Sequence, residues 1–110
     1  MSSADPAPVF AALGDRTRLS LLMKLSDGRT RSIAMLSADT RLTRQAVTKH
    51  LRVLEGVGLV ESTRSGRETR FVCRPEPFKA ARAYLDAVSA HWDDALERLR
   101  AHVEAIDKKT

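Results

Sequence analysis

A cluster of cationic and hydrogen-bonding side chains without a carboxylate lies between residues 44 and 52. Its members are Arg44, Gln45, Thr48, Lys49 and Arg52. Arginine and lysine suit the edge of guanine, glutamine suits adenine, and threonine can touch the methyl group of thymine. Phosphates would repel a carboxylate, so the absence of acids also fits contact with a polyanion. These residue types point to recognition of base edges in double-stranded DNA.

A helix must present this cluster on one face. The spacing predicts a helix that begins after Thr43 as its cap and ends near Val57, and we count Thr43 among the expected DNA contacts. Three aliphatic residues at helical spacing must face the core: Val47, Leu51 and Leu54. On a repeat of 3.6 residues, the polar set then turns outward, and its N-terminal members reach furthest into a major groove. His50 lies beside the inward residues, where it either donates to a phosphate or covers the edge of the core.

The elements on both sides of this helix fit a winged helix-turn-helix. Ser32 can cap a short helix that precedes it across a tight turn. Strand-like runs follow at 59–64 and 68–74, joined by 65–67, where Gly66 can take positive φ. Three arginines then lie at or beside the hairpin tip, in reach of phosphates: Arg64, Arg67 and Arg70. We therefore predict a mainly α fold with a small β-hairpin, in the order α-α-α-α-β-β-α.

Helices at both ends of the chain carry apolar faces. Pro6 and Pro8 can start a first short helix, and Asp15 caps a second one with Leu19, Leu22 and Leu25 on one face. A long helix from about 78 to 107 has an apolar stripe too long for one small domain to cover. We expect the two terminal helices to form a dimer interface through Val9, Phe10, Leu13, Leu85, Val88, Trp92, Leu96 and Leu99.

Length and composition indicate one soluble domain. The chain has 110 residues, of which 43% are hydrophobic and 30% charged. We expect residues 1–5 to be disordered and residues 6–107 to form a single domain. No apolar run could span a membrane, and the start lacks a secretory signal, so we expect a cytoplasmic protein.

The positive charge is concentrated in the middle of the chain. The net charge is +5, and residues 29–74 hold ten basic and four acidic side chains. This segment has a net charge of +6, whereas the remainder has −1. A basic centre between nearly neutral ends is typical of proteins that bind nucleic acid.

Two stretches and the terminal helix make the sequence similar to the ArsR family of regulators. The stretches are FAALGDRTRLSLLMKL at 10–25 and TRQAVTKHLRVLEGVGLVESTRSGRETRF at 43–71, and the helix carries Trp92. The resemblance implies a homodimer built from the first and last helices. It also implies repression by occluding a promoter, with two recognition helices in successive major grooves of a near-palindromic operator. One position differs, because Arg41 stands in the turn where the family often has glycine.

The metal sites of this family are incomplete here, so we expect neither a metal nor another cofactor. Residues 32–37 contain no cysteine, and Cys73 is the only thiol in the chain. His91 and His102 match part of a terminal-helix site. Ser89 replaces its aspartate and Ala105 its last ligand, which leaves Asp93 or Glu104 as substitutes. Zinc would need about four ligands.

Two alternatives to a simple repressor come from the same sequence. One is a sensor of this fold that a metal or ligand releases from DNA. The other is a winged helix that binds proteins, although such modules usually lose the cationic face that this chain retains. No phosphate-cradling glycine loop and no nucleophile–base pair is present, so we do not expect an enzyme.

Overall fold

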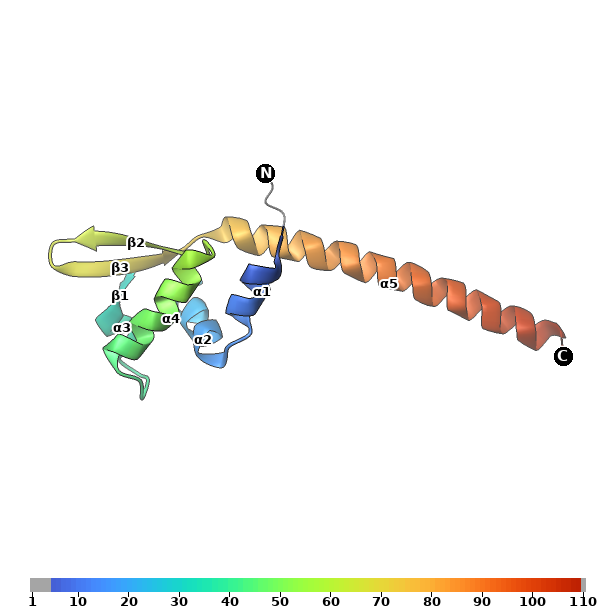
Figure 1. Cartoon of the computed structure of the whole chain (residues 1–110), viewed down its shortest axis with the longest axis horizontal. Helices are drawn as coiled ribbons and strands as arrows, with labels where there is room; N and C mark the ends of the chain where they lie inside the picture. Colours follow the sequence, from blue (N-terminus) through green and yellow to red (C-terminus); the bar gives the residue numbers. More distant parts are fainter. Residues whose placement is uncertain (1–4, 110) are drawn as a thin grey trace.

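The computed structural model describes residues 5–109 as a small body with one long helical arm (Figure 1). Within this range the elements are α1 (Ala7–Leu13), α2 (Arg16–Lys24), β1 (Arg31–Ser32), α3 (Ile33–Ser37), α4 (Arg44–Gly56), β2 (Val60–Ser65), β3 (Glu68–Cys73) and α5 (Pro75–Lys109). The predicted mainly helical fold with a β-hairpin is confirmed. Most of the segment expected to be disordered, residues 1–4, lies outside the described range. Asp5 lies inside it, and its Oδ1 accepts a hydrogen bond from the Ala7 N–H at 3.0 Å.

Three predicted caps define where α2, α3 and α4 begin. In each case a side-chain oxygen accepts a hydrogen bond from the backbone N–H three residues further on. The distances are 3.0 Å at Asp15, 3.2 Å at Ser32 and 3.0 Å at Thr43. Each bond satisfies an N–H group that has no partner within its helix, which is why these residues start helices.

The core lies between α2, α3, α4 and the sheet. Its fully buried large side chains include Phe71 of β3 and seven aliphatic residues from α2, α3, α4 and the segments that follow α2 and α4: Leu21, Leu25, Leu36, Leu51, Leu54, Leu59 and Val47. The predicted inner face of α2 was partly wrong. Leu22 and Leu25 are buried as expected, but Leu19 is 46% exposed and Leu21 takes the inner position. The buried leucines therefore lie at positions 21, 22 and 25, whereas the sequence analysis had assumed a spacing of three residues, at 19, 22 and 25.

The sheet contains one strand more than the predicted hairpin. Its order is β1-β3-β2, and all pairs are antiparallel. The β2–β3 register opposes Ser65 to Glu68, which leaves a two-residue turn where Gly66 has φ of 63°. Gly66 therefore fills the predicted role. β1 has only two residues, too few for an alternating pattern, so the sequence analysis missed it.

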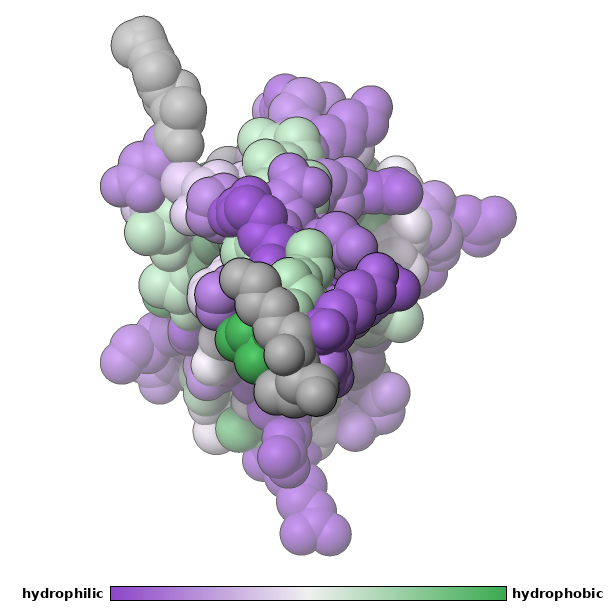
Figure 2. All heavy atoms as spheres, turned by 90° about the vertical axis from the view of Figure 1, so that its right-hand side faces the viewer, coloured by the Kyte–Doolittle hydropathy of each residue, from purple (hydrophilic) through white to green (hydrophobic). Residues whose placement is uncertain are grey.

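The last helix, α5, leaves the body soon after it begins. Its 35 residues span about 50 Å at 1.5 Å per residue. The described structure measures 75 × 35 × 21 Å. Seen from the C-terminal end of α5, apolar side chains show among the polar ones that dominate this face (Figure 2). None of the helices in residues 5–109 combines the length and apolarity that a membrane span needs.

Candidate nucleic-acid interface

α4 presents the predicted polar face because its opposite face is completely buried. Val47, Leu51 and Leu54 have no exposed surface and pack in the core. This confirms the predicted inner face. Arg44, Gln45 and Lys49 are exposed. The structure therefore brings the N-terminal part of the predicted cluster together on one open surface.

The turn between α3 and α4 closes through a threonine. The Thr40 hydroxyl donates to the Ser37 carbonyl at 2.9 Å and accepts a hydrogen bond from the Leu42 N–H at 3.3 Å. No non-glycine residue in the described range has positive φ. Arg41 therefore fits the turn without the left-handed backbone that would favour glycine. Its exposed side chain lies close to the start of α4.

Thr48 is held against its own helix. Its hydroxyl donates to the Arg44 carbonyl at 2.8 Å, and the residue is half-buried. Because this bond uses the hydroxyl hydrogen, Thr48 offers its methyl group and an acceptor oxygen to a partner. This chemistry suits contact with a thymine methyl.

Arg52 connects α4 to the wing, a role that sequence reasoning missed. Its Nη1 lies 2.7 Å from Glu55 Oε1 and 3.4 Å from Ser62 Oγ, and its guanidinium stacks 5.4 Å from the centre of the Phe71 ring. The Ser62 hydroxyl also donates to Glu55 at 2.5 Å. The hydrogen bond from Ser62, together with Arg52, lowers the pKa of Glu55 below its usual value. Arg52 is about half exposed, and its contact with DNA stays a prediction.

The three wing arginines have different surroundings. Arg64 Nε donates to the Gly66 carbonyl at 3.3 Å, and Arg70 pairs with Glu68 at 2.9 Å. Alternation along the strands puts Arg64 on the same face as Phe71 and Arg70 on the other face. Arg67, in the turn, is exposed and has no acidic partner among the described residues. The wing tip therefore offers Arg67 as its freest cation.

His50 contacts α2 beside the outer face of α4. Its Nδ1 lies 3.4 Å from Nη1 of Arg18 and 3.9 Å from Oδ1 of Asp15. A guanidinium only donates, so Nδ1 of His50 can take part in this hydrogen bond only as the acceptor. His50 and Arg18 line the same shallow groove as Gln45 and Lys49. His50 thus covers the core edge and also borders the polar face, so both readings made from the sequence stay open.

Arg18 is a second residue that the sequence analysis missed. Its Nε donates to the Ala12 carbonyl at 2.7 Å, and its Nη2 lies 3.4 Å from the Ala11 carbonyl. Arg18 thereby satisfies carbonyl groups at the C-terminus of α1 while touching α4. No local pattern predicts this, because the contact with His50 joins residues 32 positions apart.

The predicted DNA face carries positive charges that no carboxylate neutralises in the described range. Within residues 5–109, Arg44, Lys49 and Arg67 have no acidic partner, whereas Arg74 is paired with Glu61 at 2.6 Å. Four of the ten basic residues in the central segment are paired with carboxylates, namely Arg31, Arg52, Arg70 and Arg74, which leaves six without an acidic partner in the described range. Among these six, Arg44 and Lys49 lie exposed on α4, and Arg67 lies exposed in the wing turn.

The predicted dimer residues lie on α1 and along α5. Val9 and Leu13 are partly buried against the core, and the Phe10 ring lies 6.0 Å from the ring of Tyr84 on α5. Val88 is half-buried. Large apolar side chains further along α5 are about half exposed or more: Leu85, Trp92, Leu96, Leu99, Val103 and Ile106.

The two histidines of the terminal helix share one face without a third ligand. His91 and His102 are eleven positions apart on α5, which is about three turns or 16 Å. In residues 5–109, no three His, Cys, Asp or Glu side chains gather where they could hold a metal ion. That the chain binds no metal stays a prediction.

These features define a winged helix-turn-helix regulator of transcription. The family model described as "Bacterial regulatory protein, arsR family" matches residues 15–62. The chain is 40% identical over 77 residues to the uncharacterized HTH-type transcriptional regulator YuzN of Bacillus subtilis, covering 64% of this chain and 84% of YuzN. The protein belongs to the ArsR family.

Solved structures of similar proteins have the same fold. An ArsR-like transcriptional regulator from Rhodococcus sp. RHA1 superposes with a TM-score of 0.72 at 39% identity, over 86% of this chain and 88% of that one. The homodimeric winged helix-turn-helix DNA-binding domain Mb0332 from Mycobacterium bovis superposes with a TM-score of 0.60 at 28% identity, over 76% of this chain and 77% of that one. The fold class predicted from the sequence is therefore confirmed.

Proposed function

We propose that this ArsR-family protein is a homodimeric repressor that binds a near-palindromic operator in double-stranded DNA and blocks a promoter. The observation that carries this proposal is the outer face of α4. Arg44, Gln45 and Lys49 are exposed on it with no carboxylate between them. Arg67 at the wing tip adds a cation without an acidic partner in the described range. Base edges and phosphates together match this surface.

Dimerisation is supported by the apolar stripe of α5 and by the homodimeric relative Mb0332. Exposed side chains such as Trp92 and Leu96 lose contact with water if a second copy covers them, which favours association. Two recognition helices related by a two-fold axis read two half-sites one or more helical turns apart. Because the proposed target is promoter DNA, the proposal implies a cytoplasmic protein, and it requires no cofactor.

In the experiment, the protein is titrated into labelled DNA from upstream of the gene that encodes it, at several salt concentrations. We expect binding to this fragment to exceed binding to unrelated DNA, and each phosphate contact to contribute about 0.9 to the salt slope. Replacing Arg44 and Lys49 together with alanine should weaken operator binding about 100-fold or more. Neither residue packs in the core, so folding and dimerisation should be unchanged.

A matched control removes two positive charges outside the proposed face. The variant Arg98→Ala/Lys108→Ala on α5 should bind the operator within about threefold of the parent, since distant surface charges are largely screened. Operator binding that survives in Arg44→Ala/Lys49→Ala would contradict the proposal, as would equal affinity for unrelated DNA. A promoter–reporter fusion tests the sign of regulation, and repression predicts higher expression in the double variant.

A further inference from the structure

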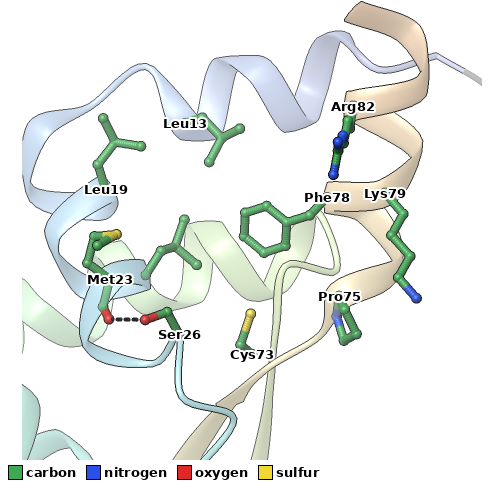
Figure 3. A pocket seen from close by; sticks show the side chains of 10 residues that line it. Leu13, Leu19, Met23, Ser26, Cys73, Pro75, Phe78, Lys79 and Arg82 are labelled. Carbon is green, nitrogen blue, oxygen red and sulfur yellow. Dashed lines mark hydrogen bonds between the residues drawn. The ribbon is translucent and has the colours of Figure 1, made fainter. Parts of the chain in front are cut away.

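An apolar pocket lies where the body meets the start of α5 (Figure 3). Its volume is about 620 Å³, within the range of small-molecule sites. α1 and α2 contribute Leu13, Leu22 and Met23, whereas α5 contributes Phe78 and Arg82. The pocket is separate from the proposed DNA face, whose groove is lined by α4 and Arg18.

The inner wall of the pocket offers almost no polar group to a ligand. The Ser26 hydroxyl already donates to the Met23 carbonyl at 2.7 Å. Cys73, at the end of β3, is half-buried, and burial raises the pKa of its thiol, so the sulfur is uncharged near neutral pH. A neutral thiol behaves as a small apolar group. The inner wall therefore suits a hydrocarbon.

The polar groups at the edge of the pocket are cationic. Arg82 and Lys79 lie on the α5 side, and no lining residue is acidic. Neither side chain has an ion-pair partner among the described residues. Arg82 lies beside Phe78 at the edge of the pocket, whereas the end of Lys79 points away from it (Figure 3). A guanidinium at the edge of an apolar pocket can bind a planar carboxylate through two parallel hydrogen bonds.

We propose that this pocket binds an amphiphilic carboxylate, a medium-chain fatty acid, with its chain against Leu22 and Phe78 and its carboxylate on Arg82. The cationic edge at Arg82 favours this occupant over an uncharged hydrocarbon, and the apolar lining accommodates the chain of either. The same ligand touches α2, the end of β3 and α5 at once. It thus lies between the body that carries α4 and the helix that carries the exposed apolar stripe.

Cys73 provides a reporter inside the pocket, because it is the only cysteine in the chain. The probe is decanoate, added to the full-length protein below its micelle concentration. Binding is measured by calorimetry, and the rate at which a disulfide reagent modifies Cys73 is followed in parallel. We expect saturable binding that slows modification of Cys73 by about tenfold or more, since bound ligand blocks access to the sulfur.

Chain length and head group test the two halves of the site separately. Affinity should rise about three- to fourfold for each added methylene from octanoate to decanoate. Decanoate should bind more tightly than decanol, and Arg82→Gln should weaken decanoate about tenfold while leaving decanol unchanged. The control Arg98→Gln removes the same charge from an exposed position further along α5 and should change neither affinity.

Three results would overturn the proposal. One is the absence of saturable decanoate binding, and another is binding that leaves the reactivity of Cys73 unchanged. The third is a thiol that is protected in the ligand-free dimer and becomes reactive when the dimer dissociates. That result would mean that a second copy of the chain fills the pocket. Each readout is independent of DNA, so failure of the proposed repressor function would not affect it.

Discussion

At the scale of single residues, Arg18 joins three elements through one guanidinium. It donates to the α1 carbonyl of Ala12 at 2.7 Å, belongs to α2, and touches His50 on α4. Hydrogen bonds from a charged group are worth more than neutral ones, and a carbonyl left without a partner costs further stability. Arg18 therefore helps to fix the position of α1 relative to α4.

The variant Arg18→Gln should lower the free energy of unfolding by about 1–2 kcal/mol, because glutamine cannot reach all three acceptors. Urea denaturation measures this change. Arg16→Gln is the control, since Arg16 is exposed and has no side-chain partner within residues 5–109, and it should stay within about 0.5 kcal/mol of the parent. Equal stability of the two variants would rule out this role for Arg18.

Glu55 should make stability depend on pH. Ser62 and Arg52 lower its pKa in the folded state, so the folded protein favours the ionised carboxylate. The ionised carboxylate therefore adds to the free energy of unfolding at pH values above its unfolded pKa of about 4.5. This added stability is lost as the pH falls through the lower pKa of the folded state. We expect Glu55→Gln to reduce the drop in melting temperature between pH 6 and pH 3.5 by about 2–4 °C. Calorimetry at a series of pH values checks this, and an unchanged drop would exclude Glu55 as a source.

At the scale of elements, the turn of the wing needs glycine at position 66 because of its backbone conformation and not because a side chain would clash there. Gly66 has φ of 63°, and an added Cβ there would meet nothing within 4 Å. A substitution therefore strains the backbone without creating a clash. The wing tip positions Arg67, so the turn matters for the proposed phosphate contact as well as for stability.

Gly66→Ala should cost about 1 kcal/mol because alanine resists the left-handed conformation. Gly56→Ala at the end of α4 is the matched control. It also meets nothing within 4 Å, but its φ is not positive, so it should raise helix stability by up to about 1 kcal/mol. Thermal unfolding of the two variants should therefore shift in opposite directions. If both variants shifted the melting temperature in the same direction, the positive φ of Gly66 would not be the reason why the turn needs glycine.

At the scale of the whole molecule, α5 carries a surface that the body does not cover. Leu96 is 58% exposed and Leu99 57%, along a helix of 35 residues. Single exposed apolar residues are ordinary, but a continuous stripe of them marks an interaction site. The proposed dimer would bury this stripe and set the distance between the two recognition helices.

Leu96→Glu/Leu99→Glu should convert the protein to monomers, because a dimer would have to bury two carboxylates in each copy. Light scattering after gel filtration measures the mass, and operator binding should weaken at least about tenfold as one half-site contact is lost. Ala90→Glu/Ala101→Glu adds the same charges to the opposite face of α5 and should stay dimeric. A dimer that persists in the leucine variant would exclude this face as the interface.

The sequence by itself determined the features that depend on neighbours a few residues away. The Thr43 cap, the burial of Val47 and Leu51, and the acid-free outer face of α4 all follow from helical spacing and local hydrogen bonds. The wing turn at Gly66 was equally predictable, because a two-residue hairpin turn calls for a residue that tolerates positive φ.

Only the tertiary structure decided which distant residues meet. Arg52 belongs to a network with Ser62 and Phe71, Arg18 reaches His50, and β1 pairs with β3 across about forty residues. The pocket at Cys73 likewise needs α2 and α5 side by side. Such contacts depend on how the packed elements are oriented, and the period of side chains along one element carries no information about that orientation.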